Sequence, residues 1–325
     1  MRYLALLVLV VAAVAGGAYL WFEREIQDRG PSTEITRVVI ERGSGLSKVS
    51  KVLAEAGVVE QARVFQAFVT LEGKDTALQA GEYQFPAGAN MQAVLDRLVR
   101  GETMRHQIVF PEGLTSHTIL QLLADAKDLS GDAPEDVPEG SLLPAAYDFT
   151  FGDDRAGIIK RMQKAMDQAV AEAWEKRAKD VPLKSPEEMV ILASIVEKET
   201  GLSGERGKVA GVFVNRLKKG MKLQSDPTTI YAVNRGKGTL GRGLRRSELA
   251  KKDPYNTYYI KGLPPGPIAN PGREALMAVA QPEETDALYF VADGTGGHAF
   301  AKTLAQHNRN VQVWRKIERK RKAAQ

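Results

Sequence analysis

Two carboxylates stand close together in the apolar stretch of residues 191–200, at Glu197 and Glu199. Side chains two residues apart on a helix point about 200° away from each other, so we expect only one of them to share the buried face. Glu199 stands above Ile195 and Val196 at the end of the apolar stripe, where burial would raise the pKa of its carboxyl. A carboxyl with a raised pKa can donate a proton near neutral pH, as a general acid must. Spacing alone also fits a glutamate that merely ends an amphipathic helix.

Composition excludes several other kinds of chemistry. The chain has no cysteine, which removes disulfides, thiolate catalysis and cysteine-based zinc sites. His298 and His307 have no third ligand at a supporting spacing, so we expect no metal and no other cofactor. The formal net charge is +5, and segment 315–322 accounts for it, with six basic residues against Glu318. A neutral body with one basic tail does not indicate a groove that follows phosphates, so nucleic acid is not an expected partner.

The elements that would position the glutamates can be read from local signals. Ser185 and Pro186 form a helix start, with an N-cap residue followed by proline at the first helical position. The sequence therefore predicts a helix over residues 185–200, preceded by another over 157–179. Residues 221–272 are rich in glycine, proline and polar side chains, and such long irregular segments in a compact domain are usually functional. A buried strand is expected over residues 288–292.

A short pattern recurs in the first half of the chain. Residues 38–43 form an apolar run that ends at Gly43, and an amphipathic segment follows. The same layout returns 70 residues later around Gly113, and a weaker copy includes Gly88. Each copy predicts a strand, a glycine turn and a helix. Such units resemble the LysM glycan-binding module, although they also occur in folds with no carbohydrate role.

The N-terminal segment has the character of a membrane span. Residues 4–22 contain no charged side chain and would form about 28 Å of helix, close to the thickness of a bilayer core. Trp21 and Phe22 stand where an interfacial aromatic belt would lie. We predict a single-pass anchor in the inner (cytoplasmic) membrane, with the rest of the chain in the periplasm. A cleaved signal peptide is the alternative, because residues 12–18 are rich in small side chains.

Residues 185–310 carry a series of motifs in a fixed order. They read ASIVEKET, VAGVFVNRL, LQSDPTTIY, PYNTY, GLPPGPIANPG and LYFVADGTGGHAF. This series resembles the YceG-like family of endolytic murein transglycosylases, and the anchor and LysM-like region are similar to that family's layout. The resemblance implies a lytic transglycosylase that cleaves the MurNAc-GlcNAc bond of peptidoglycan strands, terminating or trimming nascent strands. Expected partners are glycan strands and the inner membrane, with peptidoglycan synthases as further candidates.

The resemblance also implies one catalytic glutamate. We assign that role to Glu199, with Glu197 as the alternative acid. A single carboxylate can suffice in such an enzyme, because it first protonates the bridging oxygen and then takes the proton of the sugar's own 6-hydroxyl, which closes a 1,6-anhydro ring without water or metal. The loops would then bind sugar, although ordinary turn chemistry is the alternative for each residue. The expected substrate-binding residues are Gln224, Asp226, Tyr255, Asn256, Tyr258 and Asn270.

Two rival functions and one departure from the family pattern stay open. A non-catalytic peptidoglycan-binding or scaffolding protein would need no acid. A hydrolytic muramidase would need a second carboxylate to activate water, for which Glu205 and Asp226 are the candidates. Ala145 and Ala146 replace the polar pair that the family carries at the entrance to the catalytic domain, so the resemblance leaves open whether that turn contacts substrate.

These inferences predict an α+β protein with an N-terminal transmembrane helix, a small LysM-like α/β module and a larger mixed α+β catalytic domain. The expected bounds are 1–23 for the anchor, 24–35 for a linker, 36–127 for the module, 128–140 for a second linker, 141–318 for the catalytic domain and 319–325 for a basic tail.

Overall fold

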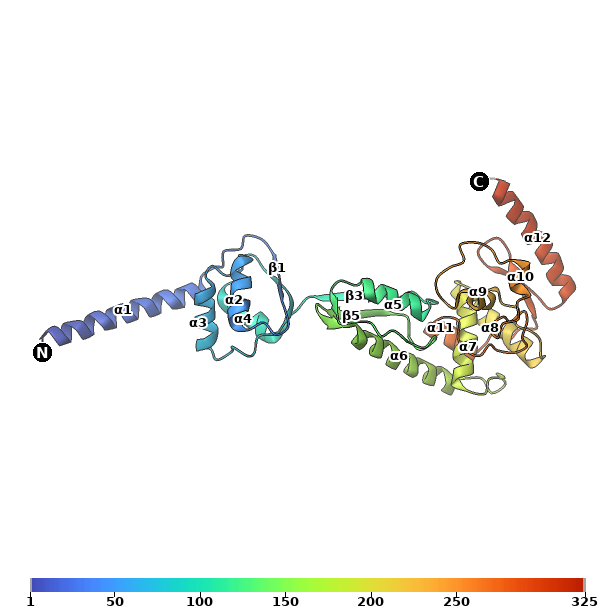
Figure 1. The fold of residues 1–325 in the computed structure, drawn as a ribbon, viewed down its shortest axis with the longest axis horizontal. Coiled ribbons are helices and arrows are strands. Elements are labelled where there is room, and N and C mark those ends of the chain that lie inside the picture. The colour runs from blue at the N-terminus through green and yellow to red at the C-terminus, as the bar shows by residue number, and fades with distance from the viewer. Residues whose placement is uncertain (1, 324–325) are drawn as a thin grey trace. The chain divides into compact units, whose positions relative to one another are not determined.

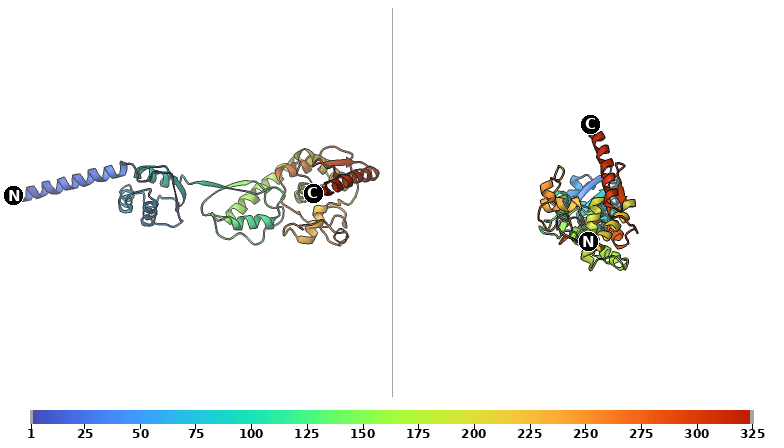
Figure 2. Two further views of the ribbon diagram at one scale, coloured as in Figure 1. Left: turned by 90° about the horizontal axis from the view of Figure 1, so that it is seen from above. Right: turned by 90° about the vertical axis from the view of Figure 1, so that its right-hand side faces the viewer.

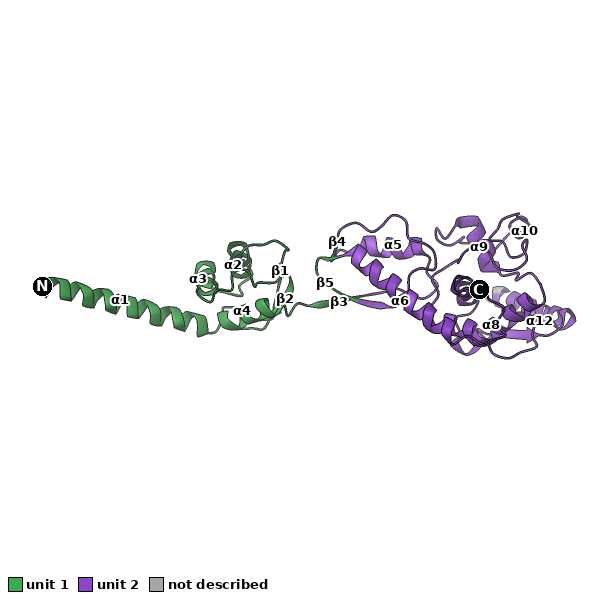
Figure 3. Cartoon of the chain, turned by 90° about the horizontal axis from the view of Figure 1, so that it is seen from below, with its two compact units in different colours: residues 1–107, 128–130, 148–153 green, residues 108–127, 131–147, 154–325 purple. Residues whose placement is uncertain are grey.

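The computed structural model describes residues 2–323, which form two compact units (Figures 1 and 3). The first unit contains residues 1–107, 128–130 and 148–153, and the second contains 108–127, 131–147 and 154–325. The mixture of helices and short strands confirms the expected α+β class and the N-terminal apolar helix. Met1 and residues 324–325, which belong to the expected anchor and basic tail, lie outside the described residues.

The first unit begins with the apolar helix and continues as two strands and three helices. Its elements are α1 (Arg2–Gln27), β1 (Thr36–Ile40), α2 (Leu46–Glu55), α3 (Ala62–Leu71), β2 (Gly81–Phe85) and α4 (Met91–Arg100). β1 and β2 are antiparallel, with Thr36 opposite Phe85 and Ile40 opposite Gly81. Tyr83 and Phe85 point from β2 into the core, because alternate residues of a strand face the same side.

Two further strand pairs lie where the chain passes between the units. β3 (Arg105–Val109) pairs with β5 (Ala146–Thr150), and β4 (Leu129–Ser130) pairs with β6 (Asp153–Asp154). The second copy of the strand-turn-helix pattern consists of β3 and α5 (Ser116–Asp125), and α5 belongs to the second unit. The expected module of residues 36–127 therefore does not coincide with a compact unit. The expected linker 128–140 contains β4 and the partly buried Glu139.

The second unit is mainly helical. Its remaining elements are α6 (Arg155–Glu175), α7 (Pro186–Glu199), α8 (Ser203–Lys218), α9 (Asp226–Asn234), α10 (Arg246–Leu249), α11 (Arg273–Ala280), β7 (Tyr289–Ala292), β8 (His298–Ala301) and α12 (Leu304–Ala323). β7 and β8 form an antiparallel hairpin that contacts the start of α12, which is red in Figure 2. Ser185 caps α7 by accepting a hydrogen bond from the Glu188 amide, as its sequence predicts.

Helix α7 lies at the centre of this unit, packed against α6, α8, α9 and α11. Every residue from Met189 to Val196 is buried, so α7 is surrounded by protein rather than amphipathic as expected. Such a helix is held rigidly, and the side chains at its C-terminal end are positioned accurately. That end is where Glu199 is found.

Candidate active site

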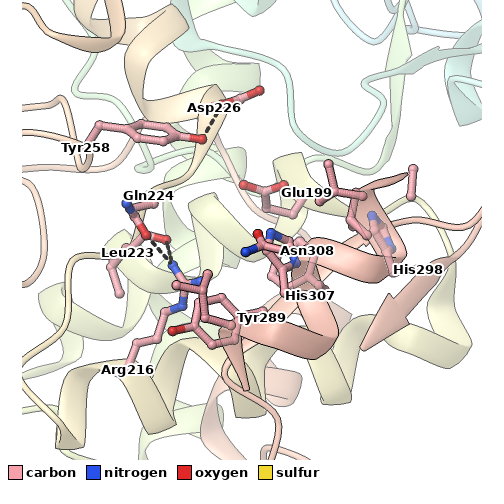
Figure 4. Close-up of a pocket in the computed structure, with 15 residues that line it drawn as sticks. Glu199, Arg216, Leu223, Gln224, Asp226, Tyr258, Tyr289, His298, His307 and Asn308 are labelled. Carbon is pink, nitrogen blue, oxygen red and sulfur yellow. Dashed lines mark hydrogen bonds between the residues drawn. The ribbon is translucent and has the colours of Figure 1, made fainter. Parts of the chain in front are cut away.

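A cavity of about 520 Å³ opens at the C-terminal end of α7 (Figure 4). Glu199 from α7 and Arg216 from α8 contribute to its floor and wall, together with Gln224 and Asp226 at the start of α9. Tyr258 comes from the irregular segment, and the β7–β8 hairpin and the first turns of α12 complete the lining. The cavity is thus built from segments that are far apart in the sequence but belong to one unit.

Glu199 is the last residue of α7, and its carboxyl is held in place by one hydrogen bond. The hydroxyl of Ser225 donates to Glu199 Oε1 at 2.5 Å. Ser225 is itself fixed, because its backbone N–H donates to Thr257 Oγ1 at 2.9 Å. Its side chain makes no capping hydrogen bond to α9. The hydroxyl therefore serves the glutamate alone.

Burial raises the pKa of Glu199 to about 7. The hydrogen bond from Ser225 opposes this shift, the negative charge of Asp226 adds to it, and the Arg216 cation again opposes it. The raised pKa expected from the position of Glu199 on its helix is confirmed. A carboxyl with this pKa is partly protonated at neutral pH and can exchange a proton in either direction.

Asp226 and Tyr258 form a hydrogen-bonded pair beside Glu199 in the same cavity. Tyr258 Oη donates to Asp226 Oδ1 at 2.7 Å. Burial and this bond to Asp226 raise the pKa of Tyr258 further above its ordinary value, so the phenol keeps its proton. Asp226 is the first residue of α9, where a carboxylate is favoured by the helix dipole.

Arg216 ties the loop before α9 to the hairpin. Its Nε donates to Leu288 O at 2.6 Å and its Nη1 donates to Leu223 O at 2.7 Å. The next residue, Gln224, has a φ of +52°, a left-handed conformation that a residue with a side chain rarely adopts. Such strain persists only where the surroundings enforce it, and it concentrates at functional sites. Here it places the Gln224 side chain in the cavity.

Glu197 does not reach this cavity, yet it is buried as well, with 5% of its side chain exposed. The expectation that only one of the two glutamates would be buried was wrong, because Arg206 and the backbone of Gly272 cover the Glu197 side chain. Glu197 Oε1 accepts from Arg206 Nη2 at 3.3 Å, and its Oε2 accepts from the Gly272 N–H at 2.9 Å. Arg206 also contacts Glu274 at the start of α11. Glu197 thus joins α7 to its neighbours.

Three of the residues expected to bind substrate stand outside the cavity. Asn256 and Asn270 are fully buried. The side-chain amide of Asn256 donates to three backbone carbonyls, those of residues 248, 249 and 251. Asn270 donates to Leu114 O at 3.1 Å and accepts from the Leu142 N–H at 2.9 Å. Tyr255 packs against another tyrosine ring at 4.9 Å. The amides of Asn256 and Asn270 are used within the fold and the Tyr255 ring packs against α9, so none of the three side chains lines the cavity.

The part of the cavity formed by the β7–β8 hairpin and α12 contains residues for which the sequence predicted no substrate-binding role. Tyr289, His298, His307 and Asn308 line the cavity, and the His307 ring stacks on Tyr289 at 5.2 Å. The motif LYFVADGTGGHAF contained two of them, so the signal was present. Among residues 2–323, no group of three or more metal-binding side chains is clustered.

Glu205, one candidate for a second catalytic carboxylate, supports His298 instead. Glu205 Oε2 lies 2.8 Å from His298 Nδ1, and Glu205 Oε1 accepts the His298 backbone N–H at 3.0 Å. Glu205 does not line the cavity. Asp226 is therefore the second carboxylate that shares the cavity with Glu199.

Fold and site together define an α+β protein whose cavity presents one sheltered carboxylic acid between polar and aromatic walls. The chain belongs to the YceG-like family, whose model matches residues 38–313. It is 32% identical to an endolytic murein transglycosylase of Bacillus subtilis, over 91% of this chain and 89% of the relative.

Two further comparisons agree with this family. An endolytic murein transglycosylase of Streptococcus pneumoniae is 28% identical over 93% of this chain, which spans 63% of that relative. The crystal structure of a YceG-like protein from Listeria monocytogenes superposes with a TM-score of 0.53 at 31% identity, covering 86% of this chain and 99% of that one.

Proposed function

We propose that this protein is an endolytic murein transglycosylase of the lytic type, which cleaves peptidoglycan strands between MurNAc and GlcNAc and leaves 1,6-anhydro-MurNAc ends. The observation that carries the proposal is Glu199, a carboxyl with a pKa of about 7 at the edge of a polar cavity. The activity of the B. subtilis and S. pneumoniae relatives, as their names state it, supports the same conclusion.

The reaction needs one group that first gives and then takes a proton. Protonated Glu199 donates its proton to the bridging oxygen as the bond from that oxygen to C1 of MurNAc breaks. Because Oε1 already accepts from Ser225, we expect the transferable proton on Oε2. The resulting carboxylate then removes the proton of the MurNAc 6-hydroxyl, whose oxygen bonds to C1. The proton count balances and no water is consumed.

The neighbouring groups would stabilise and position the sugar. The transition state of glycoside cleavage carries positive charge near C1. Asp226 places a negative charge in the cavity, and its bond from Tyr258 fixes the direction of that carboxylate. Gln224 offers an amide to sugar hydroxyls from its strained backbone position. Of the residues expected to bind substrate, Gln224, Asp226 and Tyr258 are retained in the proposal.

A hydrolytic muramidase is the second candidate, because Asp226 shares the cavity with Glu199 and could activate a water molecule. Cleavage in water enriched in ¹⁸O separates the two reactions. The lytic reaction gives anhydro ends without the heavy isotope, whereas hydrolysis gives reducing ends that contain it. Heavy oxygen in the new ends of most products would replace the lytic mechanism with the hydrolytic one.

The membrane location and the first unit complete the proposal. One helix of the described chain, Tyr3–Gln27, is long and apolar enough to cross a membrane, by length and composition. It would anchor the protein in the inner membrane with the catalytic unit in the periplasm, next to newly made strands that it would terminate or trim. The LysM-like strand-turn-helix elements of the first unit would hold glycan without cutting it, and peptidoglycan synthases are candidate partners there.

A further inference from the structure

A strongly basic segment lies in the chain between two residues of the cavity, Asp226 and Tyr258, whose side chains are hydrogen-bonded to each other. Residues 235–252 lie between α9, which begins at Asp226, and Tyr258, and both of these residues line the cavity. α9 has nine residues, so its far end lies only about 13 Å from Asp226. We call residues 235–252 the basic segment. All its basic side chains are exposed, and they are Arg235, Lys237, Arg242, Arg245, Arg246, Lys251 and Lys252.

Among residues 2–323, only two of these seven charges form an ion pair with a carboxylate. Arg235 pairs with Asp253 at 2.7 Å, and Arg242 pairs with Glu248 at 2.6 Å. The other five cations have no carboxylate within ion-pair distance among residues 2–323. They are exposed groups that fold stability does not require, since exposed charges contribute little to it. Their concentration in one segment, which joins the end of α9 to the cavity residue Tyr258, would create a local positive field that attracts anions.

The basic segment is held in place although it contains little regular structure. Thr115 Oγ1 donates to Gly236 O at 2.7 Å near its start. The buried amide of Asn256 donates to the carbonyls of residues 248, 249 and 251 near its end. Fixed cations bind an anionic partner with a smaller entropy cost than cations on a freely moving loop.

We propose that the basic segment binds the carboxylates of the peptide stems on the glycan strand that enters the cavity. This inference rests on the proposed function, because MurNAc, the sugar at the cleavage point, is the sugar that bears the stem. A strand placed with MurNAc C1 at Glu199 must send its stems out over the rim of the cavity. The arginine and lysine side chains of the basic segment have the chemistry that binds free carboxylates, and arginine can bind them through two parallel hydrogen bonds.

A charge-neutralised variant tests this inference in the full-length protein in detergent micelles. Arg245, Arg246, Lys251 and Lys252 are changed to glutamine in the Glu199→Gln background, so that binding is measured without cleavage. The matched control removes four exposed charges from α12 by changing Arg315, Lys316, Arg319 and Lys320 to glutamine. Fluorescence anisotropy with labelled strands gives Kd for strands that carry stems and for strands from which an amidase has removed them.

We expect the basic-segment variant to bind stem-bearing strands roughly tenfold more weakly, since each exposed ion pair contributes only a few-fold. Bare strands should change less than twofold, and the control should match the unaltered protein on both. Raising the salt from 50 to 300 mM should remove most of the difference, because exposed charges are screened. The double variant Lys251→Gln, Lys252→Gln should show a smaller loss of affinity for stem-bearing strands. It tests the inference if the fourfold variant does not fold.

Three results would overturn the inference. Equal loss on stem-bearing and bare strands would assign the charges to the sugar backbone, and no loss on either would leave them without this role. Loss of binding to phosphatidylglycerol vesicles, with unchanged binding to stem-bearing strands, would assign them to a membrane surface. Binding is read without catalysis, so a failure of the proposed function, in which the unaltered protein cuts no strand, is a separate observation.

Discussion

Replacing Glu199 by glutamine should make the protein more stable at alkaline pH. The pKa of Glu199 is about 7 in the folded chain, against an ordinary value of 4.5. As the pH rises from 4.5 to 7, the unfolded chain loses this proton while the folded chain keeps it, so the free energy of unfolding falls across that window. A difference of about 2.5 pKa units corresponds to about 3 kcal/mol, all of it lost above pH 7. Glutamine cannot ionise and avoids this loss.

Glu199→Gln should therefore match the unaltered protein near pH 4 and exceed its stability by about 3 kcal/mol at pH 8. Urea unfolding of the full-length protein in micelles, followed by fluorescence, would measure this, because Trp174 packs against the core that contains α7. Glu197→Gln is the matched control, two residues away on the same helix. It weakens the buried contact with Arg206 and should lower stability by roughly 2 kcal/mol.

The decisive result is that the two substitutions change the free energy of unfolding at pH 8 in opposite directions. If Glu199→Gln were no more stable than the unaltered protein at pH 8, the carboxyl would not be in a desolvating site. The argument for a raised pKa would then fail, and with it the main physical reason to regard Glu199 as the acid.

Three other outcomes are expected. Ser225→Ala removes a hydrogen bond that favours the charged form of Glu199, so the pKa of Glu199 should rise by about one unit and the alkaline limb of the pH–rate profile should move to higher pH. Ser225→Thr keeps the hydroxyl and is the control. An unchanged alkaline limb in both variants would contradict this role of Ser225. A chain truncated to residues 104–325 should fold and cut soluble strands, whereas a chain of residues 132–325 lacks β3 and α5 and should not fold. Circular dichroism measures folding and product counts measure cleavage. A folded, active chain of residues 132–325 would show that the unit boundary is misplaced. A reporter fused after Gln325 should work only if it is active outside the cytoplasm, and cytoplasmic activity would refute the proposed topology.

The sequence predicted the position and the environment of Glu199 for reasons that are local. A run of apolar residues followed by a glutamate places the carboxyl at the end of a buried helix, whatever packs around it. The same local argument failed for Glu197, because Arg206 and Gly272 come from other elements and cover the face that was expected to be exposed. Periodicity describes one helix, but burial depends on every neighbour.

The substrate-binding residues were harder to predict, because polar residues in loops serve two purposes. Asn256 and Asn270 are of the same type as a sugar-binding residue, yet their amides bond to backbone groups that only the folded chain brings near. Gln224 and Asp226 flank Ser225 in one motif. The hydrogen bond from Ser225 to Glu199 therefore brings both of them close to the glutamate. His298 owes its position to Glu205, 93 residues earlier, which no spacing rule would have indicated.

The boundary between the units was also beyond local reasoning. The repeated strand-turn-helix pattern grouped α5 with the first unit, because the copies look alike in sequence. In the structure the Ser116 N–H at the start of α5 donates to Glu139 at 2.8 Å, and Ser116 Oγ lies 3.1 Å from the Asn270 amide. These contacts join α5 to the second unit. Similar local patterns can therefore belong to different units when their tertiary partners differ.

The central claim, that Glu199 is the acid and base of the reaction, is tested most directly by counting 1,6-anhydro ends. Purified full-length Glu199→Gln and Glu197→Gln would be given the same glycan strands, and the ends would be counted by mass spectrometry at a temperature where both variants are folded. General acid and base catalysis contributes roughly 10²–10⁴-fold, and one residue that serves both steps should lie at the upper end. We expect Glu199→Gln to lose at least about a thousandfold in rate, and Glu197→Gln to keep most of its activity. Near-normal product from Glu199→Gln would contradict the claim, and loss of product in Glu197→Gln alone would move the catalytic role to Glu197.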